Sequence, residues 1–78
     1  MITIEHRQKA NRIADEFMKS HTRSVEHMNG MRSTLAWRLA GKPKGELDAM
    51  PYKLGTCQAE AWKAGNLEGK EFSIETYT

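Results

Sequence analysis

The three histidines and the single cysteine are the first candidates for chemistry in this chain. His21 and His27, with Glu26 beside the second, would be an acid–base pair if their rings met. Six residues turn a helix by about 600°, so the two rings point away from one another, and we interpret both as solvated surface histidines. Cys57 is either a reactive thiol near a helix N-terminus or, as we expect, a packed side chain on an apolar helical face.

Metal and phosphate sites are not predicted either. A structural zinc site takes four Cys or His ligands in paired short spacings, and the histidines here are spread too far along the chain to complete one with the cysteine. The segment GNLEGKE, residues 65–71, has three residues between its glycines where a phosphate-binding loop needs four, and Glu71 stands where that loop needs a hydroxyl. We predict a protein that is not an enzyme and that holds no cofactor or metal.

Basic residues are the more informative set. Residues 1–45 carry nine Lys and Arg against four Asp and Glu, a net of +5, whereas residues 46–78 carry three against six, a net of −3. This asymmetry suggests a basic surface for nucleic acid, an electrostatic contact between the halves, or two solvated faces of opposite charge. A surface that neutralises several phosphates releases counterions and binds nucleic acid in a salt-dependent way. The candidate residues are Arg7, Arg12, Arg23, Arg32, Arg38, Lys42 and Lys44, with Trp37 and Tyr52 as aromatics that can stack on unpaired bases.

The size and hydropathy of the chain limit the classes of protein to which it can belong. Seventy-eight residues make one domain, 1–78, with a thin stability margin, so support from a partner or from a homodimer is an option. No apolar run approaches the ~20 residues that span a bilayer, and the start of the chain does not have the basic-then-apolar pattern of a signal peptide. We therefore expect a cytoplasmic protein without a membrane partner.

Two helices are predicted in the first half. Over residues 5–20, Ala10, Ile13, Ala14 and Phe17 recur at helical spacing, and Thr3 is a plausible N-cap. A second helix is predicted over 24–40. It begins near Ser24 or, alternatively, is capped by Asn29 and begins near Gly30, since a glycine inside a helix costs about 1 kcal/mol relative to alanine. Gly41 suits the position after a helix and Pro43 cannot continue one.

A third helix is predicted over 52–65. Pro51 is placed to open it, with Thr56 as the alternative cap, and Gly65-Asn66 is expected to end it. Trp62 is its expected core anchor. Residues 71–77 then alternate as a half-buried strand does. One strand alone is not stable, so it pairs with the MITI segment or with another chain, or no strand forms. The predicted fold is a mainly α small three-helix domain, with a short terminal β-strand or β-pair as an option.

Residues 36–65 read AWRLAGKPKGELDAMPYKLGTCQAEAWKAG: a helix ends in Ala-Gly, a basic connector follows, then Pro-Tyr, then a helix with Trp-x-x-Gly. This pattern resembles the ribosome modulation factor family and its plasmid- and phage-borne CrpP-like relatives. Several features depart from the family: Met50 replaces its usual Cys, Asn66 replaces its second aromatic, the connector is longer, and Tyr and Trp are one residue further apart. The matching residues, which the resemblance marks as fold-defining, are Gly41, Pro51, Tyr52, Trp62 and Gly65.

The resemblance implies binding to ribosomal RNA on the small subunit. We therefore predict a small non-catalytic protein that associates with RNA or ribosomes and modulates them. The alternative is a protein-binding inhibitor or adaptor of a host enzyme, as in a phage or mobile-element accessory protein, with a homodimer joined through its C-terminal strand as one form of it. A helical DNA-binding regulator is the third hypothesis.

Overall fold

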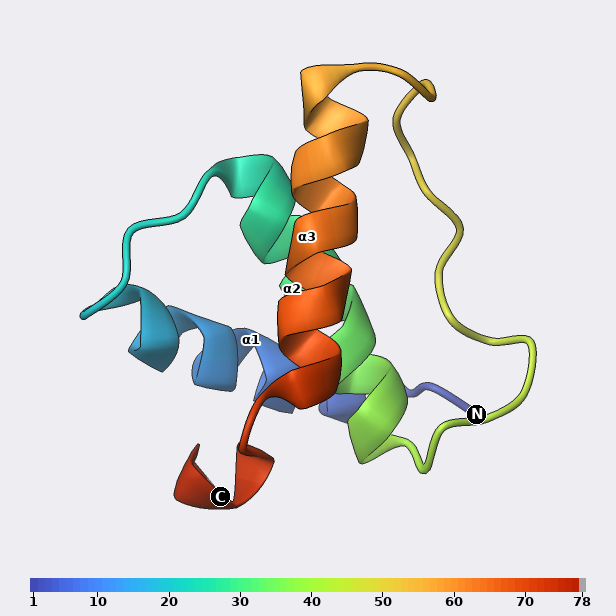
Figure 1. Ribbon diagram of the computed structural model, residues 1–78. Coiled ribbons are helices and arrows are strands. Elements are labelled where there is room, and N and C mark those ends of the chain that lie inside the picture. Colours follow the sequence, from blue (N-terminus) through green and yellow to red (C-terminus); the bar gives the residue numbers. More distant parts are fainter. Residues whose placement is uncertain (78) are drawn as a thin grey trace.

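The computed structural model describes the backbone of residues 1–77 and the side chains of residues 1–75. Three α-helices, α1 (Ile4–Met18), α2 (Val25–Leu39) and α3 (Cys57–Glu71), are followed by a 3-10 turn, η1 (Ile74–Tyr77). Helix α2 makes the main contacts with both other helices, and α3 crosses it in front (Figure 1). The mainly α three-helix fold is confirmed. No helix in the described part of the chain is long and apolar enough to cross a membrane.

Helix α1 starts where its capping residue predicts. The Thr3 hydroxyl accepts a hydrogen bond from the backbone N–H of His6, and the His6 ring accepts one from the backbone N–H of Thr3. These bonds satisfy two backbone donors that have no partner within the helix. The apolar face of α1, made of Ala10, Ile13, Ala14 and Phe17, is buried against α2 residues that include Met28, Met31 and Leu35.

Helix α2 begins at the first of its two predicted starts and runs through Gly30 to Leu39. Ser24 is its N-cap and accepts from the backbone N–H of His27. At its end Gly41 has φ +90°, and Lys42 has φ +58°. The backbone N–H of Gly41 donates to the carbonyl of Arg38 at 3.0 Å, and that of Lys42 to the carbonyl of Trp37 at 2.9 Å. This is a Schellman motif, with glycine at the position where the sequence predicts it.

Glycines allow α2 and α3 to approach closely. A Cβ on Gly30 would overlap the carbonyl oxygen of Trp62, and a Cβ on Gly65 would overlap the carbonyl oxygen of His27. The hydroxyl of Thr34 donates to the side-chain oxygen of Asn66 in the same interface. The two backbones are therefore in direct contact, which explains why Gly30 does not interrupt α2.

The third helix begins at the second of its two predicted starts, Thr56, and its predicted end is wrong. Helix α3 starts after Thr56, whose hydroxyl accepts from the backbone N–H of Ala59, and not at Pro51. It also continues past Gly65 to Glu71, because Gly65 and Asn66 are contact residues and not a stop. Trp62 is buried, at 7% exposure.

Of the alternatives for residues 71–77, the strand is not found and the absence of a strand is what the structure has: residues 1–77 contain no strand. Phe72 is extended and ends α3, and η1 follows. Both Phe72 and Ile74 are partly buried and pack against the α1–α2 core, and this explains why apolar residues alternate there. A homodimer joined through a C-terminal strand is therefore not supported by residues 1–77.

A long irregular connector, residues 40–56, joins α2 to α3 and passes beside the N-terminus (Figure 1). Glu46 accepts a hydrogen bond from the backbone N–H of Ile2 at 3.0 Å and faces the N-terminal amine at 3.6 Å. Pro51 lies exposed in this connector and Tyr52 lies there half-buried. These two residues of the family pattern therefore belong to the connector and not to a helix start.

Candidate functional site

Four of the seven basic residues predicted to bind nucleic acid use their side chains inside the molecule. Arg32, for example, donates to Asp15 Oδ1 at 2.8 Å and to the backbone carbonyl of Asn11 at 3.2 Å, which ties α2 to α1. A paired cation has less of its charge available for a phosphate. The four residues are Arg7, Arg23, Arg32 and Arg38.

Arg7 of α1 binds Asp48 of the connector through two hydrogen bonds, Nη1 to Oδ2 at 3.0 Å and Nη2 to Oδ1 at 3.1 Å. The Ser33 hydroxyl of α2 donates to the same Oδ2 at 2.5 Å. The bond from Arg7 is the largest cause of the lowered pKa of Asp48; burial opposes it and Ser33 adds to it. The same bond raises the pKa of Arg7. This cluster anchors the connector to both helices.

Arg38 caps the end of α3. Its Nη1 donates to the backbone carbonyls of Gly69 and Phe72, both at 2.7 Å. The last carbonyls of a helix lack partners within the helix, and a cation there also complements the helix dipole. The side chain predicted to meet phosphate therefore stabilises the fold.

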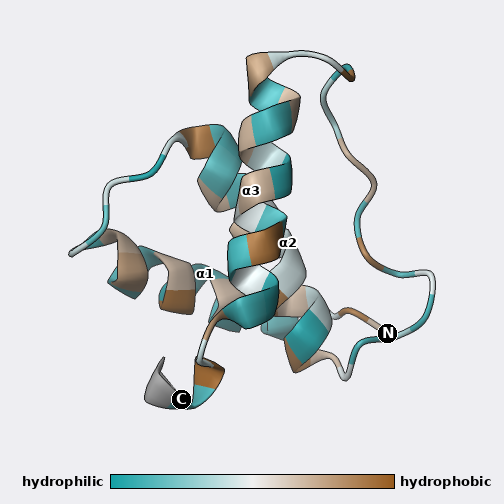
Figure 2. Cartoon of the chain, in the orientation of Figure 1, coloured by the Kyte–Doolittle hydropathy of each residue, from teal (hydrophilic) through white to brown (hydrophobic). Residues whose placement is uncertain are grey.

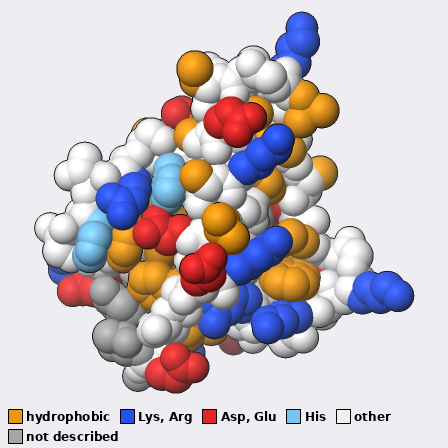
Figure 3. All heavy atoms as spheres, viewed as in Figure 1, with side chains coloured by type: hydrophobic (Ala, Val, Ile, Leu, Met, Phe, Trp, Pro, Cys, Tyr) orange, Lys and Arg blue, Asp and Glu red, His pale blue; other side chains and the backbone are white. Residues whose placement is uncertain are grey.

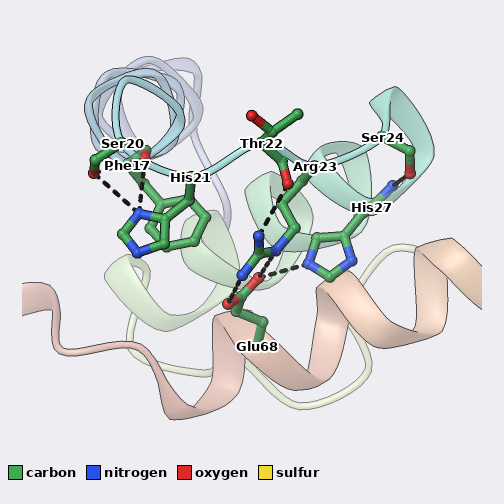
Figure 4. Close-up of polar contacts among 8 residues, drawn as sticks. All are labelled: Phe17, Ser20, His21, Thr22, Arg23, Ser24, His27 and Glu68. Carbon is green, nitrogen blue, oxygen red and sulfur yellow. Dashed lines mark hydrogen bonds and ion pairs between the residues drawn. The ribbon is translucent and has the colours of Figure 1, made fainter.

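Arg23, just before α2, and His27, in its first turn, converge on Glu68 of α3 (Figure 4). His27 Nε2 lies 2.6 Å from Glu68 Oε1, and Arg23 Nε donates to the same oxygen at 3.3 Å. Burial alone would raise the pKa of Glu68, but the hydrogen bonds from His27 and Arg23 and their charge outweigh it, so this pKa is lowered. Since the His27 side chain is 15% exposed, its prediction as a solvated histidine is wrong.

His21 does not contact Glu68 but takes part in a separate contact with Phe17, next to Arg23. Its ring stacks on Phe17 with centroids 4.3 Å apart and planes 2° apart (Figure 4). The Arg23 guanidinium lies 5.5 Å from the centroid of the same Phe17 ring, a cation–π distance. As predicted, His21 and His27 do not form a pair.

Arg12, Lys42 and Lys44 have exposed side chains and make no ion pair within the described residues. Arg12 lies on α1, whereas Lys42 and Lys44 lie at the start of the connector. The two lysines are therefore the members of the predicted set that the connector presents to solvent.

The two predicted stacking aromatics lie close to the connector or within it. The indole Nε1 of Trp37 donates to the backbone carbonyl of Pro43 at 2.9 Å, and Trp37 is half-buried. Tyr52 is half-buried further along the connector. Trp37 therefore helps to hold the turn that carries Lys42 and Lys44.

Two grooves flank α3, and the 59% exposed side chain of Leu67 lines both. The larger, of about 510 Å³, has Arg23, His27 and Glu68 in its wall. The smaller, of about 320 Å³, lies between α3 and the connector. Its lining is Leu47, Asp48, Trp62, Lys63, Asn66, Leu67 and Lys70. Figure 2 shows a hydrophobic band among hydrophilic residues on the front of α3.

No group of three or more His, Cys, Asp or Glu within the described residues could hold a metal ion. Cys57 is the exposed first residue of α3, so its prediction as a packed side chain is wrong.

The His27–Glu68 pair was missed because the predicted third helix ended at Gly65. A helix continued by one turn would have placed Glu68 near α2.

Comparisons with protein-family models, with curated proteins and with solved structures found no significant match to this chain. The resemblance to the ribosome modulation factor family therefore stays a prediction from residues 36–65.

Proposed function

We propose that this chain is a small non-catalytic cytoplasmic protein that binds ribosomal RNA and modulates the ribosome. The observation that carries the proposal is the position of Lys42 and Lys44, exposed on the connector and without an ion pair inside the described chain. Free lysines contribute to phosphate binding by releasing counterions from the nucleic acid.

The turn that presents these lysines is well held. The backbone N–H of Lys42 bonds to the Trp37 carbonyl, and the Trp37 indole bonds in turn to the Pro43 carbonyl. Binding of a ligand then costs less conformational entropy, because the turn is already ordered in the free protein. Arg12 can add a contact from α1, and Tyr52, further along the connector, can stack on a base.

The family resemblance gives separate support. Gly41 forms the Schellman end of α2, and Gly65 and Trp62 lie where α2 and α3 meet. The resemblance implies that its matching residues define the fold, and these three residues have such structural roles. Four of the predicted phosphate contacts are paired inside the molecule: Arg7, Arg23, Arg32 and Arg38. The proposed RNA-binding surface therefore consists of the other predicted cations.

The test is affinity purification of the tagged full-length chain from bacterial cells, with and without nuclease. We expect small-subunit ribosomal RNA to co-purify and to be lost on nuclease treatment. Replacing Lys42 and Lys44 by alanine should reduce recovery strongly, whereas replacing Lys9 of α1 and Lys19 at its C-cap removes the same charge and should change it little. Recovery unaffected by nuclease, or equal loss in both double variants, would contradict the proposal.

A protein-binding module is the second candidate, and exposed apolar side chains favour it. Leu67 is 59% exposed between the two grooves, and Leu54 is 72% exposed just before α3. Exposed apolar surface of this kind can mark a protein interface. A stoichiometric protein that stays bound after nuclease treatment would support this candidate over RNA binding.

A further inference from the structure

The groove between α3 and the connector combines cations with an apolar floor. Lys63 and Lys70 lie on its α3 side, and Leu47, Trp62 and Leu67 supply its apolar surface. In Figure 3 Lys and Arg side chains lie along the face that α3 presents, with hydrophobic side chains among them. None of these groove residues was among the predicted nucleic-acid contacts, and Trp62 was predicted to be a core anchor of the fold.

The two lysines share one face of α3. They are seven residues apart, which is about two turns and roughly 10.5 Å along a helix. Lys70 is exposed and makes no ion pair within the described residues. Lys63 lies 3.9 Å from Glu60, with both side chains more than half exposed, so this contact contributes little and is easily exchanged for a phosphate.

The one carboxylate in the groove is already compensated. Both oxygens of Asp48 accept from Arg7, and one accepts from Ser33 as well. An anion that enters the groove therefore meets two lysines and a neutralised acid, and the local electrostatics favour it. A groove with the same residues but a free Asp48 would not be selective for anions.

We propose that this groove binds one unpaired nucleotide of an RNA strand, with its base against the apolar floor and its flanking phosphates on Lys63 and Lys70. The inference rests on the proposed RNA-binding function and names a site for it. A hollow of about 320 Å³ lies in the size range that encloses a single small ligand. We expect it to admit a single base more readily than a duplex. Single-strand-binding proteins commonly hold bases by stacking them on aromatic side chains.

The test uses fluorescence anisotropy with a labelled random-sequence pool of single-stranded 12-nucleotide RNA. Replacing Lys63 and Lys70 by glutamine should weaken binding by about tenfold at low salt, and it should reduce the slope of log K against log salt by about 0.7 per lysine. The matched control replaces Lys9 and Lys19 by glutamine. Arginine at positions 63 and 70 keeps the charge and should retain binding, while circular dichroism checks that each variant is folded.

A second readout does not depend on the lysine variants. In a Trp37→Phe background Trp62 is the remaining tryptophan, and its emission should change when the single-stranded pool binds. A 12-base-pair RNA duplex should compete poorly. The inference is overturned if the pool does not bind, if both glutamine double variants bind equally, or if the duplex competes as well as the single strand. The proposed function itself is judged by nuclease-sensitive recovery of ribosomal RNA, so the two can fail separately.

Discussion

Glu68 and His27 are 41 residues apart in the sequence, and their side chains meet at 2.6 Å across the α2–α3 interface. Arg23 binds the same carboxylate, so one acid of α3 holds the start of α2 through two side chains. The contact links the two helices at one wall of the larger groove. Its strength depends on the charge of Glu68, and this makes it sensitive to acid.

Replacing Glu68 by glutamine should lower the free energy of unfolding at pH 7 by about 1 kcal/mol, because the charge-assisted hydrogen bonds are lost. The pKa of Glu68 is lower in the folded chain than the ordinary value of 4.5. The folded state therefore binds fewer protons than the unfolded state, and the contribution is present above pH 4.5 and lost as pH falls through the folded-state pKa. Urea unfolding at pH 7 and pH 3 should show a smaller pH dependence in the variant.

The control is Glu60→Gln on the same helix. Glu60 is 70% exposed and pairs with Lys63 at 3.9 Å, so its loss should change stability by less than about 0.5 kcal/mol. Equal pH dependence in wild type and E68Q would show that the Glu68 contact does not contribute to folding stability.

Replacing Gly65 by alanine should destabilise the chain by about 2 kcal/mol or more. Glycine to alanine in a helix normally stabilises by about 1 kcal/mol, but a Cβ here would overlap the His27 carbonyl and force α2 and α3 apart. The sign of the effect is thus the opposite of the propensity effect. Urea unfolding followed by tryptophan fluorescence measures it, and a stabilised G65A would contradict the close contact.

The same glycine shows why the third helix could not be placed from the sequence. Glycine followed by asparagine is typical of a helix end, and nothing local in the sequence distinguishes an end from a crossing point. The first two helices were predictable because Thr3 and Ser24 cap locally and their apolar residues keep one period. The start of α3 was open between Pro51 and Thr56, and Thr56 provides the cap.

The candidate site was less predictable for a related reason. A basic residue in the sequence carries no sign of its acceptor when that acceptor is far along the chain. Asp48 lies 41 residues from Arg7, and the Gly69 carbonyl lies 31 residues from Arg38. Lysines of the connector are exposed and make no ion pair within the described residues. Long-range pairing therefore decides which cations remain for a ligand.

Replacing Arg38 by glutamine should fray the end of α3. Its guanidinium bonds two backbone carbonyls, those of Gly69 and Phe72, at 2.7 Å, and their loss should cost about 1–2 kcal/mol. Amide hydrogen exchange should speed up in residues 68–72 more than in α1. The control is Arg12→Gln, which removes an exposed arginine of α1 and should leave exchange in α3 unchanged. Unchanged exchange in R38Q would refute the capping role.

Replacing Asp48 by alanine should free the connector from α1 and α2. Asp48 accepts from both Arg7 and Ser33, so the variant should be cut faster by trypsin after Lys44 and Lys53, which lie in the connector. Because the Arg7 and Asp48 side chains are 46% and 39% exposed, their coupling energy in a double-mutant cycle should be about 0.5 kcal/mol.

Asp15→Ala is the matched control for this experiment. It removes the partner of Arg32 on α1 and leaves the connector anchored. Trypsin should therefore cut D15A at the connector at close to the wild-type rate. If D48A and D15A are cut equally fast, Asp48 does not hold the connector, and the compensated carboxylate on which the α3–connector groove depends would have to be reconsidered.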